Sequence, residues 1–372
     1  TRVGKTRYLS IKVNQDIRNG EAALIIDPKG DLEVIQDIYC AAKAAGRLDD
    51  LLITHFAFPD ISAKYNPLAS YSNVSEVAGR ITSAIAASGE GQTFKDFAWQ
   101  FTNIIVRCLA ELKEPIDYKT IAFYIKRPEL MLLTYVEKTF VTTQKDYAKA
   151  VQTIIDEHNA VNKKEPLPRS EAVKEYLREH IESQASTGLS RELMDGIIVP
   201  LLHAATLDKT YYDKITASIG PVLDKINQTQ AHEIFSWDDS LGLPVIRLDD
   251  VIGRKQIAYI GLNSLTNREM AETVGQAIIA DLVSLCGRLY SQSGGGKASL
   301  CLHCDEFSNI VRDEFVNLLN KAGGAGVKVS AYTQTINDLG AVFGNNQDKP
   351  KMLMGNFGTI TMMRVSNEDT AK

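Results

Sequence analysis

The sequence has few cysteines, no excess of positive charge and no long apolar run. Its 372 residues include five cysteines, which are too scattered for the disulfide framework of a small secreted domain, so a reducing, cytoplasmic setting is expected. A net charge of −5, from 41 Lys and Arg against 46 Asp and Glu, argues against a surface coated with cations for binding duplex DNA. A basic channel stays compatible with that charge. Because no apolar run is long enough to cross a bilayer, any membrane anchor is expected outside residues 1–372.

The first residues, "TRVGKTR", contain the triplet Gly4-Lys5-Thr6. This triplet is the closing half of a phosphate-binding loop of the form G-x-x-x-x-G-K-[ST]. Alone it is weak evidence, because average residue usage produces such a triplet about once in several chains of this length. It becomes specific when a helix follows it and an acidic residue ends a strand of the same sheet. The first glycine of the motif would precede residue 1, so we expect the sequence to be part of a longer protein.

Strand and helix patterns alternate in the first and last parts of the sequence. Apolar runs bounded by turn residues predict buried parallel strands, with helices between them that end at glycine. In chain order the expected elements are helix 6–19, strand 22–26, helix 31–45, strand 51–56, strand 256–262, strand 300–304, a helix near 309–322, strand 327–332 and strand 359–365. Thr266 and Glu269 are expected to form a capping box for the helix that follows strand 256–262. The order predicts an α/β fold with a mainly parallel sheet.

The middle of the sequence has a different pattern. From about residue 73 to residue 235 the strand-like runs largely disappear and helical periodicity takes over, as in "FKDFAWQFTNIIVRCLAEL". We therefore expect an α/β domain that is split over residues 1–115 and 236–372, and an inserted all-alpha domain over residues 116–235.

The predicted strand 300–304 is followed directly by Asp305-Glu306. In P-loop ATPases an acidic pair at a strand end holds Mg²⁺ through the Asp and activates the attacking water through the Glu. Acidic pairs at strand ends are also common without that role, so this pair is weak evidence by itself. It gains weight from Lys5, because both motifs are expected at the carboxyl edge of one parallel sheet, where ligands bind.

Three further side chains lie in or after predicted strands, and each has a structural alternative. Gln334 can sense the terminal phosphate or orient water, or it can serve only as a turn or helix cap. Arg364 can reach a phosphate on a neighbouring subunit, or it can lie at an exposed strand end. Lys29, in "DPKGD", can meet phosphate or pair with Asp27, and the sequence does not decide between the two.

Cys301 and Cys304 have the C-x-x-C spacing of zinc ligands. A zinc site needs a tight turn that aims both sulfur atoms at one ion, whereas residues three apart in a strand face opposite sides. No second cluster of Cys and His lies nearby in the sequence, and the six histidines form no ligand set. We therefore expect buried core thiols at both positions.

Longer stretches of the sequence point to one family. They are "TRVGKTR", "IIDPKGD", "FPDISAKYNPLA", "FKDFAWQFTNIIVRCLAEL", "CDEFSNIVRDEFVNLLNKAGGAGVKVSAYTQT" and "GNFGTITMMRV". Together they resemble the TraD-like conjugative coupling factors of integrative elements, which are type IV coupling proteins in the FtsK/HerA-like branch of the RecA-type ATPases. The resemblance covers nearly the whole chain and is most specific over residues 1–110 and 299–366.

The resemblance implies a RecA-like P-loop nucleotide-binding domain with an inserted all-alpha domain. It further implies a hexameric ATPase at the cytoplasmic face of the bacterial inner membrane, which uses ATP and Mg²⁺. Such an ATPase brings relaxase-bound, single-stranded DNA to a type IV secretion channel and drives its transfer. Its implied partners are DNA, relaxase, accessory proteins, channel components and further copies of itself. The full-length protein would be membrane-anchored, whereas residues 1–372 alone are compatible with a soluble monomer.

The resemblance also implies roles for individual residues. The implied nucleotide-binding residues are Gly4, Lys5, Thr6 and Arg7, the magnesium ligands are Thr6 and Asp305, and the catalytic residues are Lys5, Glu306 as the base, Gln334 and Arg364. Because the first half of the loop would precede residue 1, we expect residues 1–372 to supply only part of the backbone N–H groups that bind phosphate.

Two other functions stay open. One is an ATP-driven protein-secretion motor that does not contact DNA, which stimulation of hydrolysis by DNA would distinguish. The other is a docking module that recruits substrates through its helical domain without hydrolysis. The presence together of Lys5, Asp305 and Glu306 argues against the docking module, because a site without activity does not need all three.

Overall fold

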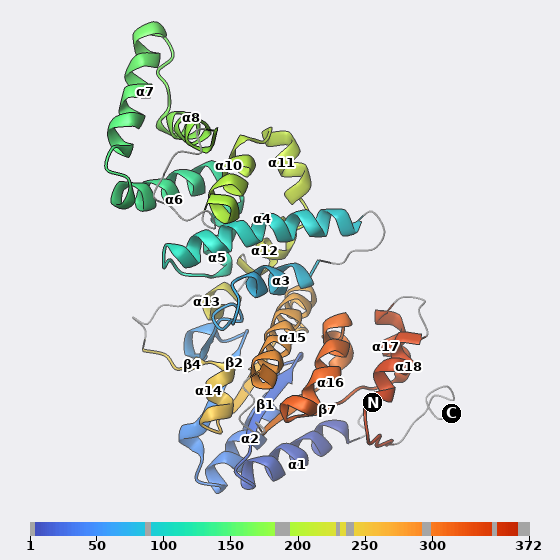
Figure 1. Ribbon diagram of the computed structural model, residues 1–372. Coiled ribbons are helices and arrows are strands. Elements are labelled where there is room, and N and C mark those ends of the chain that lie inside the picture. Colours follow the sequence, from blue (N-terminus) through green and yellow to red (C-terminus); the bar gives the residue numbers. More distant parts are fainter. Residues whose placement is uncertain are drawn as a thin grey trace. The chain divides into compact units, whose positions relative to one another are not determined.

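The computed structural model describes most of the chain, namely residues 4–85, 91–182, 194–227, 231–235, 242–291, 299–343 and 348–363. The chain forms two compact units (Figure 1). One consists of residues 1–72 and 224–372, and the other of residues 73–223. The second unit therefore begins before residue 116, where the sequence placed its start, and it ends before residue 235.

The first unit is built on a five-stranded sheet in the order β2-β5-β1-β6-β7. Every pair of neighbouring strands is parallel. The strands are β1 (Ala22–Asp27), β2 (Leu51–His55), β5 (Ile257–Gly261), β6 (Leu300–Cys304) and β7 (Val327–Ala331). All five strands were predicted from the sequence. All six residues of the central strand β1 are buried, as expected for a strand covered on both faces.

Helices cover the sheet on both sides (Figure 1). Helices α1 (Lys5–Arg18) and α2 (Leu32–Ala44) pack on one face, where their apolar residues share a core with Ala23 and Ile25 of β1. Figure 1 shows α15 (Arg268–Ser291) and α16 (Asp313–Ala325) on the other side of the sheet. Alternate residues of a strand point to opposite faces, so both helix layers bury residues of the same central strands.

Local signals explain where several helices begin and end. Gly20 and Gly46, with φ of 72° and 68°, follow α1 and α2 in the left-handed conformation that glycine adopts most easily. The predicted capping box at the start of α15 is wrong. Asn267 takes the capping role instead, because its Oδ1 accepts a hydrogen bond from the Met270 N–H at 3.0 Å.

Helix α15 passes the length and composition criteria for a membrane span, the one helix among the described residues that does so. This differs from the sequence expectation that no apolar run is long enough. Of its apolar window, 72% is buried inside the protein, and thirteen of its residues are buried. Burial on this scale is the property of a core helix of the α/β unit.

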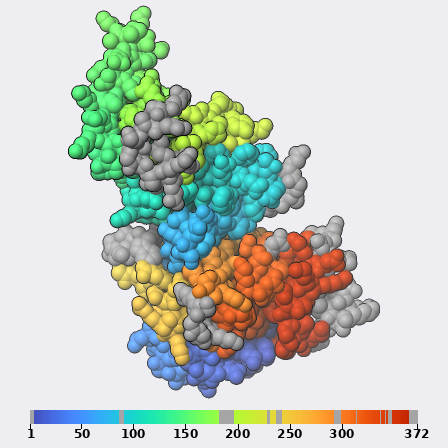
Figure 2. Space-filling model, in the orientation of Figure 1, coloured from blue at the N-terminus to red at the C-terminus, as the bar shows by residue number. Residues whose placement is uncertain are grey.

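The remaining elements of the first unit are short. They are a two-stranded parallel sheet of β3 (Lys64–Tyr65) and β4 (Val245–Ile246), α13 (Ala231–Phe235), α14 (Leu248–Gly253), α17 (Ile336–Val342), α18 (Asp348–Gly355), and the 3-10 turns Leu48–Asp50, Pro59–Ile61 and Phe307–Asn309. The helix expected near 309–322 is thus a 3-10 turn followed by α16. In the space-filling view α17 and α18 form part of the surface (Figure 2).

The predicted strand over 359–365 is wrong for the residues that the structure describes. Residues 359–363 have no regular structure and residues 359–362 are exposed. Strand propensity alone does not form a strand without a partner and a buried face. The last two residues of the prediction, including Arg364, lie outside the described residues.

The described residues of the second unit form helices and their connections. The helices are α3 (Ser75–Ser83), α4 (Gly91–Glu111), α5 (Tyr118–Ile125), α6 (Pro128–Thr143), α7 (Tyr147–Val161), α8 (Arg169–Glu182), a π-helical turn at Met194–Ile198, α10 (Val199–Thr206), α11 (Lys209–Thr216) and α12 (Gly220–Asn227), which contains the unit boundary. Phe140, Tyr147 and Tyr176 form an aromatic cluster with edge-to-face ring contacts. Such contacts stabilise the packing of α6, α7 and α8.

Candidate nucleotide-binding site

Residues from the two ends of the chain meet at the carboxyl edge of the sheet. Lys5 is the first residue of α1, and Asp305 and Glu306 directly follow β6. The Lys5 ammonium donates a hydrogen bond to Glu306 Oε2 at 2.7 Å and lies 3.1 Å from Asp305 Oδ1. The structure therefore brings together the two motifs that the sequence placed at one sheet edge.

The backbone around Glu306 holds its side chain in place. Glu306 has φ of 40° and ψ of 46°, a left-handed conformation that costs a residue other than glycine about 1–2 kcal/mol. Hydrogen bonds on both sides compensate, because the Asp305 N–H donates to the Ile26 carbonyl at 3.0 Å and the Phe307 N–H donates to the Tyr332 carbonyl at 2.9 Å. The turn after β6 is thereby tied to β1 and to the end of β7.

Burial and the neighbouring lysines shift the pKa values of Asp305 and Glu306 in opposite directions. Burial raises the pKa of Asp305, and the nearby Lys5 ammonium offsets this only in part. Burial also raises the pKa of Glu306, but hydrogen bonds from Lys29 and Lys5 outweigh it and hold that pKa below its usual value. Glu306 is therefore an ionised carboxylate that binds two ammonium groups.

The donor set fits Mg²⁺. Asp305 Oδ1 is buried and has no hydrogen-bond partner of good geometry, although it lies within ion-pair distance of Lys5. Thr6, which is partly buried, carries a hydroxyl oxygen at the start of α1. Among the described residues no group of three or more His, Cys, Asp and Glu forms a metal site. Mg²⁺ commonly takes only one or two protein oxygen atoms and receives the rest from phosphates and water.

The contact of Asp27 with Tyr259, next to the site, was not identified from the sequence. Asp27, at the end of β1, is 1% exposed and accepts hydrogen bonds from the Lys29 N–H, the Asp31 N–H and the Tyr259 hydroxyl at 2.9, 2.7 and 2.7 Å. The sequence signal for Tyr259 was its phenol inside the apolar run "QIAYIGL". The partner lies 232 residues away and follows only from the pairing of β1 with β5.

Lys29 has a partner that neither sequence alternative named. Its ammonium donates to Glu306 Oε2 at 2.6 Å, while its backbone N–H binds Asp27. Burial lowers the pKa of Lys29, but the contact with Glu306 outweighs this effect and the net pKa is raised. The Lys29 side chain thus belongs to the site.

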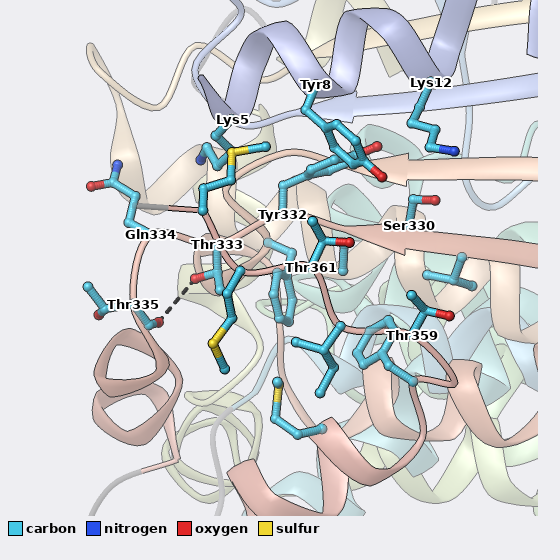
Figure 3. Close-up of a pocket in the computed structure, with 18 of the residues that line it drawn as sticks. Lys5, Tyr8, Lys12, Ser330, Tyr332, Thr333, Gln334, Thr335, Thr359 and Thr361 are labelled. Carbon is cyan, nitrogen blue, oxygen red and sulfur yellow. Dashed lines mark hydrogen bonds between the residues drawn. The ribbon is translucent and has the colours of Figure 1, made fainter. Parts of the chain in front are cut away.

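A pocket of about 580 Å³ lies beside this cluster (Figure 3). Lys5 and Gln334 line it at the same end in Figure 3, and Lys12, Ser330 and Thr359 are at the other end. Asp305 and Glu306 are not among its lining residues. The volume is in the range of small-molecule sites, so the pocket offers space next to the Lys5 ammonium.

The other predicted site residues have mixed outcomes. Gly4 has φ of 89° and is exposed, as are Arg7 and Gln334. Arg364 lies outside the described residues, so its position is not part of the site geometry. Among the described residues the five cysteines are free thiols, and the pair in β6 is buried, as expected for core thiols.

Comparison with known proteins gives a partial sequence match and a match of fold. A family model described as the TraM recognition site of TraD and TraG matches residues 299–372. No curated protein matches the chain. Among solved structures, the unbound monoclinic form of the bacterial conjugative coupling protein TrwBdeltaN70 is similar with a TM-score of 0.56 and 13% identity, over 96% of this chain and 65% of that chain.

Two further TrwB structures are similar. The plasmid coupling protein TrwB in complex with ADP and Mg²⁺ has a TM-score of 0.50 and 10% identity, over 92% of this chain and 69% of that one. TrwB with the non-hydrolysable GTP analogue GDPNP has a TM-score of 0.50 and 11% identity, over 92% and 70%. This chain spans 65% of the TrwBdeltaN70 chain. The chain therefore has the fold of TrwB, and its C-terminal segment, residues 299–372, matches the family model of the TraM recognition site of TraD and TraG.

Proposed function

We propose that the protein is the ATPase motor of a conjugative type IV secretion system. It couples relaxase-bound, single-stranded DNA to the secretion channel and drives DNA transfer by ATP hydrolysis. The observation that carries the proposal is the meeting of Lys5, Asp305 and Glu306 at the carboxyl edge of a parallel sheet, in a chain whose segment 299–372 matches a TraM recognition site.

The geometry suits phosphoryl transfer to water. The first backbone N–H groups of α1 and its dipole attract phosphate, and Lys5 adds a positive charge at the same helix end. Glu306 would orient and polarise the attacking water, and Gln334, which lines the pocket, would sense the terminal phosphate. Thr6 and Asp305 would hold Mg²⁺, which when bound neutralises the charge of the phosphate oxygens.

The comparisons support the choice of ligands and partners. TrwB has been solved with ADP and Mg²⁺, which supports ATP and Mg²⁺ as the ligands here. The TraM recognition match supports an accessory protein as a partner of segment 299–372. In the full-length protein, held at the inner membrane, we place ATP between subunits of a homo-hexamer, with Gly4 and Arg7 beside it and Arg364 reaching a neighbouring site.

DNA would pass through a basic channel and be held by its backbone. Contacts of that kind are independent of base sequence and weaken with salt, because each phosphate neutralised by Lys or Arg releases counterions. The overall charge of −5 requires that the cations be concentrated in the channel. The helical unit would supply the surface that recognises relaxase or accessory proteins.

The proposal is tested by ATP hydrolysis of the full-length protein with and without single-stranded DNA. We expect DNA to stimulate hydrolysis, salt to reduce the stimulation, and Lys5→Ala to abolish turnover. Lys43→Ala, which removes an exposed lysine at the end of α2, is the matched control and should behave as wild type. Hydrolysis by the assembled hexamer that is insensitive to DNA would contradict the DNA motor and favour protein secretion without DNA contact.

A further inference from the structure

One carboxylate oxygen of the site binds two ammonium groups. Glu306 Oε2 lies 2.7 Å from Lys5 Nζ and 2.6 Å from Lys29 Nζ. The two nitrogen atoms can therefore be no farther apart than the sum of these distances. A phosphate group that reaches the Lys5 ammonium is then also within reach of the Lys29 ammonium, because its oxygen atoms point in several directions.

The backbone that carries Lys29 is fixed. Asp27 accepts hydrogen bonds from the N–H groups of Lys29 and Asp31, and it is itself held by the Tyr259 hydroxyl. The Ser264 N–H donates to the Pro28 carbonyl at 2.7 Å. The loop between β1 and α2 is thus tied to β5 and to the segment that follows β5.

Gly30 and His55 complete this fixation. The Ala57 N–H donates to His55 Nδ1, so the ring proton lies on Nε2, which donates to the Gly30 carbonyl at 3.0 Å. Gly30 has φ of 71°, and a Cβ atom there would lie 2.5 Å from His55 Nε2. A side chain at this position would therefore meet the His55 ring and would also have to adopt a left-handed backbone conformation.

The Lys29 side chain, in contrast, can move. It is 36% exposed, whereas the Lys5 side chain is 14% exposed and that of Glu306 is 7% exposed. A lysine has a flexible four-carbon chain and three donors. The structure therefore combines a rigid support with one mobile cation, aimed at the carboxylate that the proposed function places next to the attacking water.

On the basis of the proposed function, we propose that Lys29 is a second phosphate-binding lysine. Its ammonium moves away from Glu306 and contacts the terminal phosphate of a bound nucleoside triphosphate. The terminal phosphate is specified because Glu306 acts on the water that attacks it, and Lys29 lies against Glu306. When the Lys29 side chain moves from Glu306 to the phosphate, Glu306 Oε2 also becomes free to accept a hydrogen bond from that water. The same side chain thus links recognition of the triphosphate to release of the base.

The test compares binding of a slowly hydrolysed triphosphate, ATPγS, with binding of ADP by the full-length protein, using calorimetry. Lys29→Ala and Lys29→Met are expected to weaken ATPγS binding about 10- to 100-fold, the effect of one charge-assisted hydrogen bond. ADP binding should change by less than about 3-fold, since no terminal phosphate is present for Lys29 to contact. Lys29→Arg keeps the charge and should restore most of the ATPγS affinity. Lys43→Ala is the surface control.

Three results would overturn the proposal. Unchanged ATPγS binding in Lys29→Ala is the first, and equal losses for ATPγS and ADP, which would indicate a collapsed loop, are the second. The third is faster hydrolysis with unchanged binding, which would make Lys29 only a restraint on Glu306. Lys5→Ala separates this proposal from the proposed function. If Lys5→Ala weakens binding and Lys29→Ala does not, only the role of Lys29 fails, and if neither weakens binding, the nucleotide site itself fails.

Discussion

The hydrogen bond from Tyr259 to Asp27 joins β5 to the start of the β1–α2 loop through a buried carboxylate. Tyr259→Phe removes the hydroxyl and leaves Asp27, a carboxylate that is 1% exposed, with two donors in place of three. Burial raises the pKa of Tyr259 and the Asp27 charge raises it further. The hydroxyl therefore stays protonated and keeps donating throughout the neutral pH range.

The size of the effect follows from the charge of the acceptor. A hydrogen bond to an ionised group contributes about 1.5–3 kcal/mol, so Tyr259→Phe should destabilise the α/β unit by about that amount. Asp27→Ala should cost more, about 3–5 kcal/mol, since it leaves the buried Tyr259 hydroxyl and two backbone N–H groups without their acceptor.

A double-mutant cycle separates this bond from other effects. The double variant Tyr259→Phe with Asp27→Ala should be little less stable than Asp27→Ala alone, with a coupling energy of about 1.5–3 kcal/mol. Hydrogen exchange of the amides in β1 and β5 measures the free energy of opening for this unit by itself. Additivity of the two single changes to within about 0.5 kcal/mol would refute the reasoning, because independent sites behave in that way.

Two further predictions concern packing and thiol chemistry. Gly275→Ala should lower the melting temperature at a cost of about 1–3 kcal/mol, because its Cβ would lie 2.4 Å from Ile310 Cγ2. In the same helix, a Cβ atom added at Gly287 would meet nothing within 4 Å, so Gly287→Ala should stabilise the protein by about 0.5–1 kcal/mol. Equal effects of the two changes on the melting temperature would contradict this packing. With Ellman's reagent at neutral pH, Cys40 should react quickly, since it is exposed. Burial raises the pKa of Cys286 to about 11 and that of Cys301 to about 12, so fast reaction of a second thiol would contradict their burial.

The strands of the sheet were predictable because buried parallel strands need continuous apolar runs. All residues of β1 and β6 are buried, so neither strand has a solvent-exposed polar face that would interrupt its apolar pattern. The same criterion failed for residues 359–363, whose strand-forming side chains are mostly exposed. Whether such a segment pairs depends on a partner strand, which local sequence does not specify.

The candidate site was predictable to the extent that its residues lie in recognisable motifs. Lys5 and Asp305-Glu306 were found because each follows a loop or strand of known form. The contacts of Asp27 with Tyr259, and of Lys29 with Glu306, join residues 232 and 277 positions apart. Only the order of the strands in the sheet brings these residues together, so no local pattern could have identified them.

Turnover and nucleotide binding of Glu306→Gln test the central claim most directly. The change keeps the size of the side chain and removes the negative charge that the account assigns to activation of water. The account predicts that the full-length variant still binds ATPγS but hydrolyses ATP about 10²- to 10⁴-fold more slowly, the usual contribution of a general base. Turnover equal to wild type, with or without single-stranded DNA, would contradict it.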